Sequence, residues 1–90
     1  PVIHVTGAEK FRSVNQHVLG DRIEAMTYLI AGLMTGGKVS VQGVPRSFIE
    51  SSLGVLIQAG AIVEEDHNGL SITADRRLTS VSFETAPFPG

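Results

Sequence analysis

The most constraining feature of this sequence is an uncharged run over residues 25–35 (AMTYLIAGLMT), inside a segment that carries helix signals at both ends. A helix on the surface of a globular protein has one polar face, whereas this run is apolar on nearly all sides. As a helix it reaches only about 16 Å, roughly half of the hydrocarbon thickness of a membrane. The sequence therefore predicts a helix that lies between layers of protein.

Both ends of this helix, predicted over residues 21–37, are marked by residue type. Asp21 is suited to accept hydrogen bonds from the free amides of the first turn, and Glu24 is placed to reach back to the Asp21 amide in a capping box. Their negative charges also suit the positive end of the helix dipole. Gly36 and Gly37 supply the left-handed residue that ends a helix at low cost.

Length, charge and cysteine content exclude several classes of protein. Ninety residues fit one small domain, and the net charge of −2 gives no general attraction to nucleic acid or to anionic membranes. Without cysteine the chain has no disulfide, thiolate nucleophile or thiolate metal site. Residues 1–10 lack the basic and apolar regions of a signal peptide. The three histidines show no spacing typical of metal ligands, so no metal site is predicted; they are His4, His17 and His67.

Hydrophobic periodicity predicts a second helix and several strands. The second helix, residues 45–60, begins near Pro45 and carries an apolar stripe at helical spacing, made by Ile49, Leu53, Leu56 and Ile57. A hairpin is predicted at residues 67–69, because Asn-Gly adopts the positive φ angles of a two-residue turn. Alternating apolar residues predict strands over residues 1–6, 12–19, 38–42, 61–66, 70–74 and 79–85.

This order of elements predicts an α+β fold, a two-layer α/β sandwich built from one βαβαββ unit with flanking strands. Right-handed crossovers place both helices on one face of the sheet. One thin sheet cannot cover every apolar side chain of the first helix, notably Met26, Tyr28, Leu29 and Leu33. We therefore expect the chain to self-associate through its helix layer.

Several short motifs then give the sequence a family resemblance. DRIEA at residues 21–25, followed by Thr27 and by TGG at 35–37, resembles the enolpyruvyl transferase family. QAGA at 58–61 and TAPFPG at 85–90 match further segments of that family in the same order, so the resemblance covers most of residues 14–90. DRIEA and TAPFPG are closer to the members that act on UDP-N-acetylglucosamine, and the members that act on 3-phosphoshikimate are the alternative.

The resemblance implies a fold and an activity. Family members have two domains, each of three βαβαββ units, arranged as an inside-out barrel with helices inward. They are cytoplasmic and need no cofactor, and the closer members transfer enolpyruvyl from phosphoenolpyruvate to UDP-N-acetylglucosamine, the first committed step of peptidoglycan synthesis. The chain then forms a single domain, residues 1–90, in which 1–11 end one unit, 12–74 form a complete unit and 79–90 begin the next.

The same resemblance implies that this chain is inactive by itself and holds no catalytic residue. The lysine, the loop cysteine and the substrate-binding arginines of the family lie on other units, and its catalytic aspartate follows the TAPFPG segment. The candidates for substrate binding are Arg22 and Asp21, because an arginine at a helix N-terminus adds positive charge where anions already bind. The alternative is a plain helix cap beside a solvated arginine.

Other charged or glycine-containing stretches suggest no site. Residues 36–38 (GGK) imitate a phosphate loop but follow a helix, whereas a P-loop precedes one. Residues 76–77 (RR) are typical of a solvated loop, and residues 64–66 (EED) of a charged edge that discourages strand pairing.

Two functions of other classes remain open from the sequence. The βαβαββ order also occurs in small RNA-binding domains, although these carry a basic face with interleaved aromatic residues, and here aromatic residues are 6% of the chain. The second open function is a non-catalytic assembly module that oligomerises through the exposed side of its helices.

Overall fold

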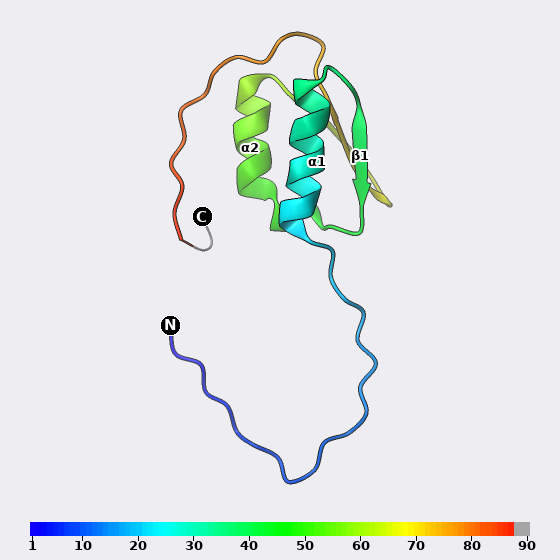
Figure 1. Cartoon of the computed structure of the whole chain (residues 1–90), viewed down its shortest axis with the longest axis vertical. Helices are drawn as coiled ribbons and strands as arrows, with labels where there is room; N and C mark the ends of the chain where they lie inside the picture. The colour runs from blue at the N-terminus through cyan, green and yellow to red at the C-terminus, as the bar shows by residue number, and fades with distance from the viewer. Residues whose placement is uncertain (88–90) are drawn as a thin grey trace.

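The computed structural model describes residues 1–87, and both helices lie on one face of a three-stranded sheet (Figure 1). This confirms the predicted α+β, two-layer arrangement. In chain order, the elements are α1 (Arg22–Met34), β1 (Val39–Gln42), the 3-10 turn η1 (Arg46–Phe48), α2 (Glu50–Ala59), β2 (Ile62–Asp66) and β3 (Gly69–Thr73).

The sheet has the order β1-β3-β2, and both pairs of strands are antiparallel. β3 is therefore the central strand, and its Ile72 lies opposite Val39 of β1 and Val63 of β2. Alternate residues of β3, Leu70 and Ile72, are buried. This alternation is the period-2 pattern expected when one face of a sheet packs on helices.

The core lies between the helix layer and the sheet. α1 contributes Ala25, Leu29 and Leu33 at intervals of four residues, so they share one side of the helix. From the second helical segment Ile49 and Leu53 are buried, as their spacing predicts. The cluster is completed by Val44, Ala61, Leu70 and Ile72.

α1 is covered on one side only. Leu29 is fully buried, whereas Met34 is 79% exposed and Ile23 is 70% exposed. The expectation that this thin layer leaves part of the apolar helix uncovered is confirmed for Tyr28, which is exposed, while Leu29 and Leu33 are covered. Within residues 1–87 no second layer covers α1, so the predicted position between two layers of protein is not formed by this part of the chain and stays a prediction for a longer protein.

The helix ends follow the sequence signals with two differences. Oδ1 of Asp21 accepts hydrogen bonds from the amides of Ile23 at 2.7 Å and Glu24 at 3.4 Å. Within residues 1–87, the Glu24 side chain makes no return bond to the Asp21 amide, so only half of the predicted capping box forms. Pro45 opens η1 instead of α2. Gly60 ends α2 with φ of 110°, as predicted for a left-handed cap.

The β2–β3 hairpin forms by a mechanism different from the predicted one. Asp66 pairs with Gly69, so the turn consists of His67 and Asn68. Within residues 1–87 only Gly36, Gly43 and Gly60 have positive φ, so the predicted Asn-Gly geometry is wrong. Instead, Oδ1 of Asp66 accepts hydrogen bonds from the amides of Asn68 at 2.8 Å and Gly69 at 3.0 Å, which is an Asx-type turn.

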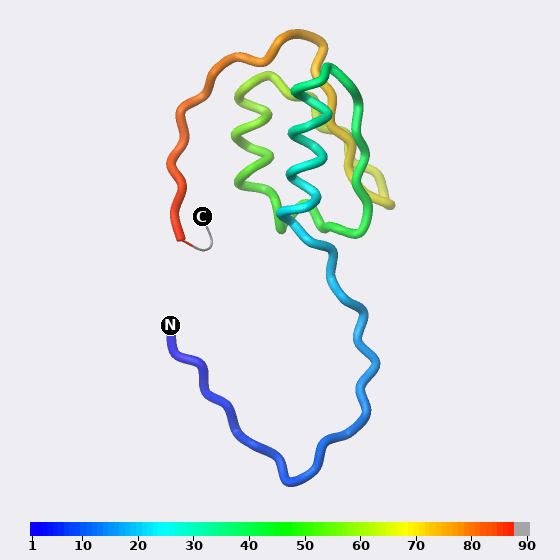
Figure 2. Tube along the Cα trace, in the orientation of Figure 1, coloured from blue at the N-terminus to red at the C-terminus, as the bar shows by residue number. Residues whose placement is uncertain are grey.

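Three predicted strands, at residues 1–6, 12–19 and 79–85, are not formed. The N-terminal arm, defined as residues 1–20, runs away from the body of the protein (Figure 2). Residues 79–85 start from Thr79, whose amide donates to the Ala59 carbonyl at 2.9 Å, and then run beside α2, away from the sheet (Figure 1). A strand needs a neighbour about 4.8 Å away, and neither segment meets one. The last residues of the TAPFPG tail, 88–90, lie outside the described residues.

Candidate functional site

A groove opens on the side of the helix layer that faces away from the sheet. α1 and α2 both begin at the same end of the molecule, so the positive ends of two helix dipoles lie together there (Figure 1). Beside these N-termini is a cavity of about 290 Å³, lined by Arg22, Ile23, Met26, Thr27, Ile30, Phe48, Ile49, Ser51 and Ser52.

The two predicted site residues take different positions at this groove. Arg22, the first residue of α1, lines the cavity. Asp21 does not line it, because its carboxylate accepts the amides of Ile23 and Glu24. Asp21 thereby fixes where α1 begins, and so it positions Arg22 without facing the groove itself.

Sequence reasoning missed two residues of this cavity, Ser51 and Ser52. They lie in the first turn of α2, and their signal was the pair of hydroxyls directly after the helix start at Glu50. One arginine and two serines at converging helix N-termini form a surface suited to a phosphate group. Within residues 1–87, the cavity is lined by no cysteine, histidine or carboxylate that could act as nucleophile or general base.

The groove continues into a second, mainly apolar cavity of about 430 Å³. It shares Met26, Ile30, Ser51 and Ser52 with the first cavity, and it is bounded by Val55 and Leu56 of α2. Phe83 of the C-terminal segment forms part of its wall. The outer side of the helix layer is thus polar near Arg22 and apolar further along.

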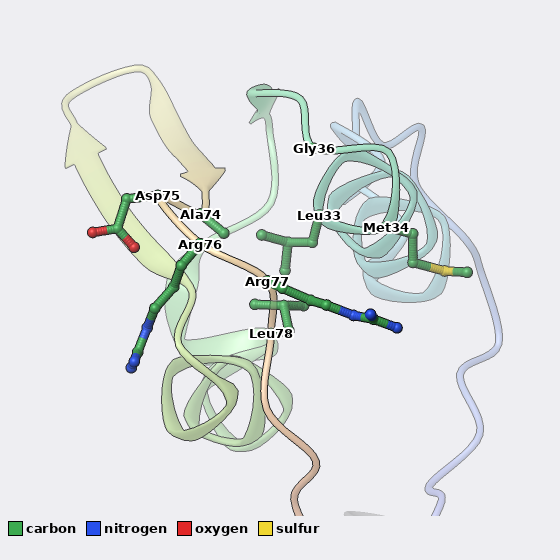
Figure 3. Close-up of a pocket in the computed structure, with 8 residues that line it drawn as sticks. All are labelled: Leu33, Met34, Gly36, Ala74, Asp75, Arg76, Arg77 and Leu78. Atoms are coloured by element: carbon green, nitrogen blue, oxygen red, sulfur yellow. The ribbon is translucent and has the colours of Figure 1, made fainter.

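Another cavity, of about 510 Å³, lies at the opposite end of α1 and has the two arginines of the RR loop beside it (Figure 3). Their side chains point in different directions, Arg77 toward Met34 and Arg76 away from it (Figure 3). Arg76 instead lies beside Gly60, at the C-terminal end of α2. The two guanidinium groups do not converge, which agrees with the reading of this loop as solvated.

The ion pairs made by Arg46 connect secondary-structure elements and lie outside the groove. Arg46 of η1 donates to Glu50 at 2.7 Å and to Glu65 at 3.4 Å, which connects the start of α2 to β2. The hydrogen bond from Arg46 holds the pKa of the Glu50 carboxyl below its ordinary value and raises the pKa of Arg46. All three side chains are at least one-third exposed, so these pairs are screened by water.

Neither a metal cluster nor a membrane span is found in the described part of the chain. Across residues 1–87, histidine, aspartate and glutamate side chains form no group able to hold a metal ion. No helix in that range has the length and apolar character needed to cross a bilayer.

Comparison with known proteins gives independent evidence of the family to which this chain belongs. The whole chain, residues 1–90, matches the EPSP synthase (3-phosphoshikimate 1-carboxyvinyltransferase) family. It is 38% identical over 88 residues to the UDP-N-acetylglucosamine 1-carboxyvinyltransferase of Kosmotoga olearia, covering 98% of this chain. The enzymes of that name from Halorhodospira halophila and Caulobacter vibrioides are 40% and 41% identical, over 98% and 100% of this chain.

The chain spans 21% of the length of each of these relatives. Similarity of this degree over the entire chain, together with the α+β fold, is sufficient to assign the chain to a family. The motifs DRIEA and TAPFPG lie inside the matched range. The chain belongs to the EPSP synthase family of enolpyruvyl transferases.

Proposed function

We propose that this chain is one structural unit of an enolpyruvyl transferase that moves the enolpyruvyl group of phosphoenolpyruvate onto UDP-N-acetylglucosamine. The supporting observation is the 38–41% identity, over nearly the whole chain, to relatives named for that acceptor. The whole enzyme would then act in the cytoplasm, in peptidoglycan synthesis. Residues 12–74 would form its βαβαββ unit, with residues 1–11 and 79–90 belonging to the neighbouring units.

Within that enzyme, Arg22 would contribute positive charge toward a phosphate group of the substrate. Its position supports this role, since it lines a groove at the N-termini of α1 and α2 beside Ser51 and Ser52. Asp21 would act as a positioning residue, because its two hydrogen bonds set the first turn of α1. A guanidinium group presents several N–H donors in a planar fork, which suits phosphate oxygens.

The isolated chain is expected to be inactive. Within residues 1–87, Arg22 is the only charged side chain that lines its cavity, and one cation is not enough to bind a diphosphate tightly. UDP-N-acetylglucosamine should therefore bind with a Kd above about 1 mM, which corresponds to about 4 kcal/mol. A phosphate-release assay with phosphoenolpyruvate and UDP-N-acetylglucosamine should give no turnover above buffer.

NMR titration with UDP-N-acetylglucosamine tests the proposed site. Shifts should centre on residues 20–24 and on the amides of Ser51 and Ser52, and Arg22→Ala should remove them. Arg12→Ala is the matched control, because Arg12 is exposed on the N-terminal arm and lines none of the cavities described above. Micromolar affinity, or shifts that persist in Arg22→Ala, would contradict the role given to Arg22.

The acceptor has one alternative, 3-phosphoshikimate, which the description of the matching family itself names. The same titration distinguishes the two acceptors. Shifts at residues 20–24 that appear with shikimate 3-phosphate, and not with UDP-N-acetylglucosamine, would favour the alternative.

We further propose that the chain self-associates through its helix layer. Ile23 and Met34 of α1 are exposed, Ile30 is 39% exposed, and the groove between the helices is largely apolar. Contiguous apolar patches on small domains usually mark an interface. In a two-fold dimer, a second copy would pack its helix layer against this helix layer, and the apolar patch of each copy would be removed from water.

Sedimentation equilibrium at tens of micromolar tests this interface with two variants of similar exposure. Ile30→Glu places a charge in the helix layer and should shift the chain toward monomer. Ile62→Glu is the control, because Ile62 is 42% exposed and alternates along β2 with Val63, which packs on the core. A monomeric parent chain, or equal dissociation by both variants, would contradict the proposal.

A further inference from the structure

Asn68 and Gly69 form the one asparagine–glycine pair in the sequence, and such a pair is chemically reactive. The backbone nitrogen of the glycine attacks Cγ of the asparagine side chain, because glycine has no Cβ that hinders the approach. The only other asparagine, Asn15, is followed by Gln16, whose side chain hinders the same attack. Asparagine is accordingly one of the thermolabile residues of proteins. The turn between β2 and β3 therefore holds the groups needed for a spontaneous modification.

The reaction at this pair needs no reagent other than water. The Gly69 nitrogen loses its proton and bonds to Cγ of Asn68, and the side-chain nitrogen of Asn68 leaves as ammonia, which gives a succinimide ring. Water then opens the ring at either carbonyl. The product is aspartate or isoaspartate at position 68, with one new negative charge.

In the folded chain the attacking amide is already hydrogen-bonded. The Gly69 N–H donates to Oδ1 of Asp66 at 3.0 Å, and the Asn68 N–H donates to the same oxygen at 2.8 Å. The attack requires the Gly69 nitrogen to lose its proton, and the carboxylate that accepts this N–H disfavours the negative charge that would form. The two bonds also hold the turn in one conformation. Asn68 itself is exposed, so burial gives it no protection.

The close approach of β1 requires glycine after Asn68. A Cβ on Gly69 would overlap with the carbonyl oxygen of Val41. Gly69 also pairs with Gln42 of β1 and with Asp66 of β2, so it is held on both sides. A bulkier residue, which would slow the attack on Asn68, cannot be placed there without moving β1. The packing of the sheet therefore retains the reactive pair, and protection has to come from the turn itself.

We propose that Asn68 is a deamidation site, and that the carboxylate of Asp66 holds it unreactive while the hairpin is closed. Deamidation then proceeds only through local opening of the turn, so its rate follows how often the hairpin opens. The product places a negative charge beside the acidic end of β2, and isoaspartate also lengthens the backbone of the turn. Both changes weaken the pairing of β3 at this end of the sheet. This inference concerns the chemical stability of the fold and goes beyond the proposed transferase function.

Gln16→Gly supplies an unprotected reference in the same molecule, because it gives Asn15 a glycine neighbour on the exposed N-terminal arm. The variant is incubated in mildly alkaline buffer, and peptide mass spectrometry follows deamidation at both asparagines. Asn15 should react several-fold faster than Asn68 in native buffer, and the two rates should become similar in denaturant. Equal rates in native buffer would overturn the proposal. A difference that persists unchanged in denaturant would do the same, because it would reflect the flanking sequence.

Asp66→Ala provides the second measurement, since it removes the acceptor and keeps the reactive pair. Deamidation of Asn68 should become several-fold faster, whereas Asp75→Ala, which removes an exposed carboxylate after β3, should leave the rate unchanged. Hydrogen exchange removes the same proton from the Gly69 nitrogen, so exchange of that amide, followed by NMR, should accelerate by a similar factor. An unchanged deamidation rate in Asp66→Ala, with or without faster exchange at Gly69, would show that Asp66 does not protect the site.

Discussion

The ammonium group of Lys38 lies 2.6 Å from Oε2 of Glu64, across the central strand of the sheet. Lys38 directly precedes β1 and Glu64 belongs to β2, and Ser71 of β3, paired with Glu64, donates to the same carboxylate at 3.5 Å. One ion pair therefore connects the two edge strands over the outer face. Its hydrogen bond and charge hold the pKa of Glu64 below its ordinary value.

The first prediction concerns the pH dependence of this pair. Because the pKa of Glu64 is lower in the folded state, the pair stabilises the fold above the ordinary glutamate range, and this contribution is lost as the pH falls through the folded pKa. Lys38→Met should raise the pKa of Glu64 toward its ordinary value, measured by NMR titration of the carboxyl carbon. Lys10→Met, on the exposed N-terminal arm, should leave it unchanged.

Denaturant unfolding of the parent chain and Lys38→Met gives the corresponding stability. The difference between the two should be present near neutral pH and should disappear in acid, once Glu64 is protonated in both. A difference that stays constant down to low pH would show that Lys38 acts through something other than Glu64.

The second prediction concerns the close approach of α1 to β1. Gly32 is buried in α1, and a Cβ there would overlap with Cγ2 of Val39. Alanine normally favours a helix by about 1 kcal/mol over glycine, yet overpacking in a core costs about 1–3 kcal/mol. Gly32→Ala should therefore lower the free energy of unfolding, and Val39→Ala in the same chain should restore part of the loss. Equal effects with and without Val39→Ala would contradict the contact.

The third prediction separates the covered side of α1 from its exposed side. Leu29→Ala should lower the free energy of unfolding by about 2–5 kcal/mol, because it leaves a cavity in the core. Met34→Ala removes a side chain that is 79% exposed and should change it by less than about 0.5 kcal/mol. Chemical denaturation of monomeric protein measures both, and similar losses would mean that the exposed side is covered in solution.

The fourth prediction concerns the β2–β3 turn. Asp66→Ala removes the acceptor for the amides of Asn68 and Gly69 and should cost about 1 kcal/mol. Asp66→Asn keeps a carbonyl acceptor and should cost less. Hydrogen exchange at the Asn68 and Gly69 amides gives a local readout, since Asp66→Ala should accelerate both. Gly69→Ala should also destabilise the hairpin, because its Cβ would overlap with the carbonyl oxygen of Val41.

Local signals in the sequence determined both helices, the three strands of the sheet and the residues that end the helices. Asp21 and Gly60 act as the predicted caps, because capping depends on groups only a few residues apart. Leu70 and Ile72 face the core, as their alternation predicts. The motifs also identified the family, and they singled out Arg22, which lines the groove.

Tertiary structure alone decided whether strand-like segments become strands and which side of α1 is covered. The alternation around Val14 and Val18 fits a strand, but a strand forms only where another offers its backbone groups. The sequence of α1 likewise shows that the helix is apolar, and only packing decides that Leu29 is covered while Met34 is exposed. Ser51 and Ser52 joined the site for the same reason: they lie 29 and 30 residues from Arg22, and only the parallel packing of α1 and α2 brings them to one groove.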